Sequence, residues 1–282
     1  MESGSRILRS RREISLMRRA GILVWQAHQA AAQLLTPGVS TAQLEAALAE
    51  VFSDADAEPL FLNYPGVTPF PAVSCISVNE ELVHGIPGPR VLENGDIVSI
   101  DTGCRIGGWC GDAAVTHAVG DVSARAKKIL RVTHGALNLA IELMASKKWW
   151  SEVAKEMQEY IEGQKCSVIT SMVGHAIGQE MHESPQVPNY FDPAWVEGED
   201  FDLRPGVVIA VEPMVSLGTP ELRHLDDHWT CITQDKSLCA HFEHTIAITK
   251  EGPRRLTTAP ESDEEKSLLP DWLQDESRWL VW

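Results

Sequence analysis

Two pairs of helical segments, each accompanied by strand-like segments, are the feature that most constrains the fold of this chain. Apolar residues recur every three or four positions over Ile14–Leu34, which predicts an amphipathic helix. Ser40 and Gln43 then resemble a capping box that opens a second helix. The same kind of spacing predicts another pair at about 123–146 and 151–164.

Strand-like segments follow each helix pair. Asp96–Thr102 and Ala113–Val119 flank Gly107 and Gly108, which predicts a β-hairpin with a wide loop. Three further strands are expected at Val207–Val211, Trp229–Thr233 and Thr245–Thr249. The order indicates two similar halves, without a residue-level repeat, and an α+β fold that closes one shared core.

Composition excludes several classes of function. The chain has 282 residues, of which 44% are apolar and 23% charged, as in ordinary globular proteins. A formal net charge of −16 disfavours nucleic acid as the main ligand, because phosphate contacts need clustered Lys and Arg. We see no apolar run of about 20 residues and no secretory signal, so we expect a cytoplasmic protein without a membrane partner. Six cysteines without CxxC spacing predict reduced thiols rather than a zinc ribbon.

Four carboxylates and one imidazole form the candidate centre, in the order Asp101, Asp112, His175, Glu212, Glu243. Taken singly, each is more often a turn residue or a solvated charge. Asp101 and Glu212, however, directly follow apolar runs, so their carboxylates are expected inside, where they would repel one another without cations. An oxygen-rich set of this size can hold two divalent ions that ionise a shared water. The set therefore predicts a metal-dependent hydrolase.

Two more histidines are candidates for proton transfer. His84 lies in a turn between Gly85 and Val83, and His182 follows His175 by seven residues. A histidine beside a metal-bound water can accept or return a proton near neutral pH. On sequence context alone, hydrogen-bonded structural histidines are an equally good interpretation.

Several ordered motifs carry a family resemblance. They are Thr36–Thr41 (TPGVST), Cys75–Asn79 (CISVN), Val83–Pro87 (VHGIP), Gly95–Asp101 (GDIVSID), Gly111-Asp112, Gly174-His175 with His182, Val211–Val215 (VEPMV), Trp229 and Phe242–Thr245 (FEHT). In combination they resemble the type I methionine aminopeptidases, members of the pita-bread family that also contains prolidase, aminopeptidase P and creatinase. The resemblance runs from about Ile14 to Leu256.

The resemblance implies a fold and a domain organisation. It implies a pita-bread fold with two pseudo-symmetric α/β halves, a central curved antiparallel sheet and helices on its outer face. We expect a single catalytic domain over residues 1–258 and an acidic, tryptophan-containing tail over 259–282. The tail is expected to be a helix docked through its tryptophans, since exposed tryptophans are costly, with a partner-binding tail as the alternative.

The resemblance also implies a ligand set. Asp101 and Asp112 would ligate a metal pair, with Asp112 bridging, His175 and Glu212 would complete one shell, and Glu243 would bridge both ions. The cofactor is then two divalent ions, and Co, Mn, Fe and Zn all suit these ligands.

Substrate contacts are implied in the same way. His182 would steady the carbonyl or developing oxyanion, His84 would bond the amide nitrogen, and Glu212 would shuttle the proton of the bridging water. The methionine pocket is expected to consist of Cys75, Phe70, Met181, Trp229 and Tyr64, since soft apolar walls suit a thioether.

The chain departs from the family pattern at a few positions. Ala176 stands where glycine is usual, Cys110 where a histidine commonly precedes Gly-Asp, and Met181 where an aromatic residue is usual. The segment Tyr64–Val73 is about three residues longer than the usual loop. None of these departures removes a metal ligand.

The implied activity is removal of the initiator methionine from nascent proteins when the second residue is small. N-terminal Met peptides and nascent chains would be the substrates, the ribosome a partner that no basic patch supports, and the enzyme a monomer. One alternative is a prolidase or aminopeptidase P, but those usually carry an extra N-terminal domain, and only about 95 residues precede the first hairpin. Another is a non-catalytic binding module, which would have lost metal ligands.

Overall fold

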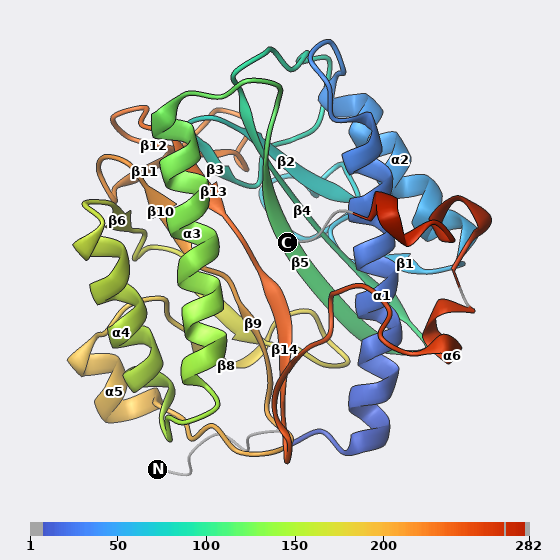
Figure 1. The fold of residues 1–282 in the computed structure, drawn as a ribbon. Helices are drawn as coiled ribbons and strands as arrows, with labels where there is room; N and C mark the ends of the chain where they lie inside the picture. The colour runs from blue at the N-terminus through green and yellow to red at the C-terminus, as the bar shows by residue number, and fades with distance from the viewer. Residues whose placement is uncertain (1–7, 268, 280–282) are drawn as a thin grey trace.

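Four long helices lie against antiparallel strands in the computed structural model, which describes residues 8–267 and 269–279 (Figure 1). They are α1 Arg11–Leu34, α2 Thr41–Asp54, α3 Ala124–Leu143 and α4 Trp150–Gly163, followed by the shorter α5 Pro193–Glu199 and α6 Asp263–Lys266. The predicted capping box of Ser40 and Gln43 is present. A second box, in which the Ser10 side chain accepts from the Glu13 backbone, starts α1 three residues before the predicted position.

The strands form four sheets with antiparallel pairing throughout the described residues. The first sheet contains β1 Glu58–Pro59, β2 Ser74–Val78, β4 Ile97–Ile106 and β5 Trp109–Ala118. The largest has the order β15 Gly252–Arg255, β14 His244–Thr249, β9 Val208–Val211, β7 Gly174–Ala176, β8 Glu183–Val187. The two small sheets are β13 Cys239–His241, β10 Met214–Ser216, β6 Ser167–Val168 and β11 Leu222–His224, β12 Cys231–Thr233, β3 Glu81–Val83.

The hairpin of β4 and β5 is tighter than the sequence predicts. Its strands pair from Ile97 opposite Ala118 to Ile106 opposite Trp109, so only two residues turn the chain. These are Gly107 and Gly108, with φ of 59° and 81°. Two left-handed residues make the two-residue turn that matches the twist of a hairpin, so the expectation of a wide loop was wrong.

Each half of the molecule has its own core. One is formed where α1 and α2 pack on β2 and β4, and the other where α3 and α4 pack on the strands of the second half, as Figure 1 shows. The halves meet at β5 and β14. There the Glu243 amide donates to the Ala114 carbonyl at 2.8 Å, and the Thr245 hydroxyl donates to the Asp112 carbonyl at 2.9 Å. Helices over two antiparallel halves confirm the α+β class.

The segment after Pro260 packs on the outer side of α1. Leu269, Leu273 and Trp279 contact Ile22 and Trp25, and the indole rings of Trp25 and Trp279 meet edge to face at 5.0 Å. Short turns replace the single docked helix that the sequence suggested.

The tryptophans of this segment differ in their surroundings. Trp279 docks, whereas Trp272 is 41% exposed and Trp282 lies outside the described residues.

No membrane-spanning helix is found among residues 8–267 and 269–279, because their helices lack the combination of length and apolar character that a bilayer requires.

Candidate metal and peptide site

A cavity of about 490 Å³ opens where the two halves meet, and residues of both line it. Its volume is in the range of ordinary small-ligand sites. All twelve site residues predicted from the sequence lie on its wall: Tyr64, Phe70, Cys75, His84, Asp101, Asp112, His175, Met181, His182, Glu212, Trp229 and Glu243. Residues up to 179 positions apart in the chain therefore share one surface.

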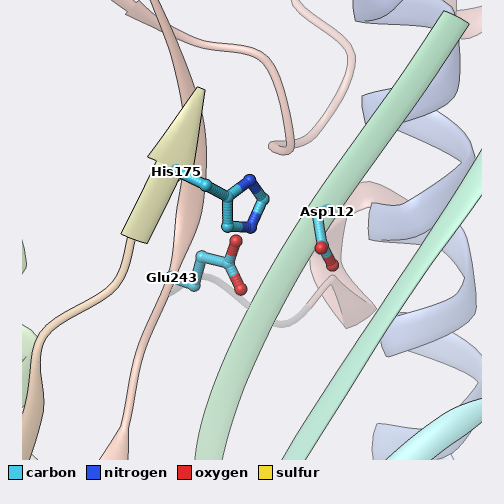
Figure 2. A group of neighbouring side chains, drawn as sticks. All are labelled: Asp112, His175 and Glu243. Carbon is cyan, nitrogen blue, oxygen red and sulfur yellow. The ribbon is translucent and has the colours of Figure 1, made fainter. Parts of the chain in front are cut away.

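Asp112, His175 and Glu243 form the tightest group in this cavity. Each offers one ligand atom, and the three atoms lie within 4.8 Å of one another. Figure 2 shows the Asp112 carboxylate on β5 and the Glu243 carboxylate directed toward the imidazole of His175. Oxygen and nitrogen donors at this separation fit a divalent transition-metal ion.

Asp101 and Glu212 complete the predicted acidic set. Asp101 lies on β4 opposite Cys75 of β2, and Glu212 directly follows β9. A Glu212 carboxylate oxygen lies 3.6 Å from His175 Nε2. All five predicted ligands thus line one cavity. The group whose ligand atoms lie within 4.8 Å of one another consists of Asp112, His175 and Glu243.

The carboxylates are costly to ionise in this setting. Burial raises the pKa of Asp112 to about 7. Burial, together with repulsion from the neighbouring carboxylates, also raises the pKa of Asp101, Glu212 and Glu243 well above ordinary values. One oxygen each of Asp101, Asp112 and Glu243 is buried without a hydrogen-bond partner in the described part of the chain. Unpartnered buried oxygens that repel one another are what a bound cation would satisfy, so the donor set fits a divalent metal.

His84 and His182 lie on the cavity wall as neutral imidazoles. Burial, followed by the nearby His224 and His182, lowers the pKa of His84 to about 4, and burial also lowers the pKa of His182. His84 has a left-handed backbone, with φ of 59°. Histidine adopts this conformation more readily than most residues, and here it places the ring against Trp229, with 6.3 Å between centroids.

The apolar wall is built around Trp229. Phe70 meets its indole edge to face at 5.2 Å, and the indole Nε1 donates to the Thr68 carbonyl at 2.9 Å. Cys75 and Met181 belong to the same cluster. Five apolar wall residues were not predicted as site residues from the sequence: Phe61, Val83, Met172, Val173 and Met214.

His241 is a further polar wall residue that sequence reasoning missed. Its Nε2 lies 3.6 Å from a Glu212 oxygen, its side chain is buried, and neither ring nitrogen has a hydrogen-bond partner among residues 8–267 and 269–279. The signal was available, since His241 precedes Glu243 by two residues and alternate residues of an extended segment face the same side.

The departures from the family pattern have local explanations. The pairing of β7 with β8 shifts between His175 and Ala176, and the Ala176 carbonyl lies 3.1 Å from His175 Nδ1. Cys110 donates its amide to the Gly178 carbonyl at 2.8 Å and its thiol to the Gln179 carbonyl at 3.4 Å. Cys110 therefore supports the turn that precedes His182.

Comparison with known proteins gives concordant results. Residues 15–250 match the model of metallopeptidase family M24. Methionine aminopeptidase 1 of Bacillus subtilis is 42% identical, over 87% of this chain and 96% of the relative. The crystal structure of methionine aminopeptidase from Thermotoga maritima is 39% identical, with a TM-score of 0.84 over 90% of this chain and 99% of that one. Prolidase from Pyrococcus furiosus shares the fold at 24% identity, with a TM-score of 0.70 over 92% of this chain and 67% of that one.

Proposed function

The chain belongs to metallopeptidase family M24, and we propose that it removes the N-terminal methionine from nascent proteins whose second residue is small. The observation that carries the proposal is the identity of 42% to a methionine aminopeptidase over nearly the whole of both chains. The metal-dependent hydrolase and the fold predicted from the sequence agree with this membership. Nascent chains as substrates would place the enzyme in the cytoplasm, at the ribosome. We further propose that it acts as a monomer.

We propose that Asp101, Asp112, His175, Glu212 and Glu243 hold two divalent ions. The unpartnered buried oxygens and the mutual repulsion of the carboxylates support this set. When bound, such ions polarise a peptide carbonyl and lower the pKa of a coordinated water. We assign residues 1–258 to the catalytic domain that carries the site and 259–282 to the tail.

The remaining side chains orient the peptide and handle its protons. The Glu212 carboxylate, with two imidazoles at 3.6 Å, is placed to take a proton from the attacking water and return it to the leaving amine. His182 would donate to the oxygen that becomes negative, and His84 would accept a hydrogen bond from the amide N–H. The apolar wall around Trp229 would take the methionine side chain and exclude water from the reacting bond.

Prolidase-type activity is not favoured. The prolidase of Pyrococcus furiosus is 24% identical, which shows a common fold, against 39% for the methionine aminopeptidase structure with nearly full coverage of both chains. A non-catalytic module is not favoured either, because all five candidate ligands face one cavity.

Peptide hydrolysis tests the proposal. We expect the purified protein, supplied with Co, Mn, Fe or Zn one at a time, to release methionine from Met-Ala-Ser and to leave an Ala-Pro-Ser peptide intact. Asp112→Ala should abolish methionine release through loss of a carboxylate that would hold the metal. Cleavage of the proline peptide without methionine release would overturn the assignment, as would near wild-type turnover of Asp112→Ala.

A further inference from the structure

Tyr64 makes a direct contact with His182 that a simple pocket residue does not need. The phenol oxygen lies 2.7 Å from His182 Nδ1, and the two rings meet edge to face with 5.4 Å between centroids. The residues are 118 positions apart in the chain, so the contact depends on the tertiary fold. A distance of 2.7 Å is that of a good hydrogen bond involving a hydroxyl group.

The backbone holds Tyr64 in place on its loop. The Tyr64 amide donates to the Phe61 carbonyl at 2.9 Å, and the Tyr64 carbonyl accepts from the Phe70 amide at 3.0 Å. Trp229 ties down the far end of the loop through Thr68. The hydroxyl is therefore presented from a closed loop, which reduces the entropy lost on forming the bond.

His182 is held from the other side. Its ring lies edge to face with that of His175 at 4.3 Å. The next residue, Glu183, pairs with the buried Arg9 and accepts from the Gln179 amide at 3.0 Å. Between Tyr64 and His175, the imidazole has little freedom to turn.

A neutral imidazole carries one proton, and its position decides what the ring can do. If Nδ1 carries it, Nε2 can only accept, and the ring cannot donate through Nε2 to a developing oxyanion. If the Tyr64 hydroxyl donates to Nδ1, the proton must be on Nε2. A partner at one ring nitrogen is the usual way in which proteins fix the tautomer of a histidine.

We propose that Tyr64 is a positioning residue whose hydroxyl donates to His182 Nδ1 and fixes the Nε2–H tautomer of that ring. The catalytic consequence rests on the proposed function, whereas the tautomer itself does not. Tyr64 then acts on the reaction through His182 rather than through contact with the methionine side chain.

Tyr64→Phe separates the two roles, because it removes only the hydroxyl and keeps the ring. We expect kcat for Met-Ala-Ser to fall about tenfold to a hundredfold, as for other residues that orient a catalytic group, with KM changed less than about twofold. In a His182→Ala background the same substitution should have no further effect on kcat. Tyr160→Phe, on α4 in the core of the second half, is the matched control and should leave kcat unchanged.

Nitrogen-15 NMR of His182 in the metal-free protein gives a readout that does not depend on activity. At neutral pH we expect a single Nε2–H tautomer in the wild type and a mixture of tautomers in Tyr64→Phe. A wild-type Nδ1–H tautomer, or an unchanged spectrum in Tyr64→Phe, would overturn the proposal, and so would an unchanged kcat in an active enzyme. If the spectra behave as expected while methionine peptides are not cleaved, the proposed function fails and the positioning contact stands.

Discussion

Replacing Arg18, a buried residue of α1, by alanine should lower the free energy of unfolding. Arg18 is 2% exposed, and its guanidinium donates to the carbonyls of Leu256, Thr258 and Ala259 at 2.8, 2.9 and 2.6 Å. It also pairs with Glu265 at 3.1 Å. The Arg18 side chain of α1 therefore holds in place the segment that follows β15, from Leu256 to Glu265.

The size of the effect follows from the burial of these groups. Removing one partner of a buried charge pair costs about 3–5 kcal/mol, because the other polar groups are left without compensation. The Glu265 side chain is 18% exposed, and water can reach part of the vacated space, so we expect the lower end, about 3 kcal/mol. For a chain of this length roughly 2 °C per kcal/mol applies, which gives a fall in melting temperature of about 6 °C.

Differential scanning calorimetry of Arg18→Ala beside Arg19→Ala measures this directly. Arg19 is the next residue of the same helix and is exposed, so its substitution should change stability by less than about 0.5 kcal/mol. Equal melting temperatures of the two variants would refute the reasoning, since they would show that the buried guanidinium contributes no more than a solvated one.

Two further substitutions test the same packing. Burial raises the pKa of Glu265, but hydrogen bonds from Arg18 and the backbone outweigh it and hold the pKa below 4.5. The ionised carboxylate therefore adds stability above that pH, and this stability is lost as the pH falls below it. The melting-temperature gap between wild type and Glu265→Gln should therefore shrink from pH 7 to pH 4; a constant gap would contradict this. A Cβ on Gly111 would lie 2.8 Å from the Gly21 amide nitrogen of α1, so Gly111→Ala should cost about 1–3 kcal/mol and reduce Met-Ala-Ser hydrolysis by moving the adjacent Asp112, a proposed metal ligand. Gly88→Ala, where a Cβ meets nothing within 4 Å, is the control, and equal thermal stability of the two variants would count against the close approach of α1 and β5.

The sequence predicted the elements that have strong local signals. The four long helices have regular apolar spacing, α1, α2 and α3 also have serine caps, and each was found within a few residues of its expected bounds. Turn geometry was less accessible. The hairpin loop at Gly107 was expected to be wide, between strands that end at Thr102 and resume at Ala113, whereas pairing continues to Ile106 and Trp109. Hydrogen bonding, rather than side-chain pattern, extends those strands.

Specific motifs identified residues that line one cavity, whereas residues defined only by a tertiary contact were not found from the sequence. All five proposed ligands line one cavity: Asp101, Asp112 and His175 lie within β4, β5 and β7, Glu212 directly follows β9, and Glu243 directly precedes β14. His241 was not predicted as a site residue, because the motif Phe242–Thr245, which contains Glu243, begins one residue after it. The contact of Tyr64 with His182 joins two loops that nothing in the sequence relates, so only the folded structure reveals it.

Calorimetric titration of the metal-stripped protein with Mn²⁺ measures whether the buried, mutually repelling carboxylates of the cavity bind divalent cations. We expect saturable binding to the wild type, with affinity at least about tenfold weaker in Asp112→Asn, which keeps the shape of the side chain and removes its charge. Absence of binding to the folded wild type, or equal affinity of the two proteins, would contradict the account.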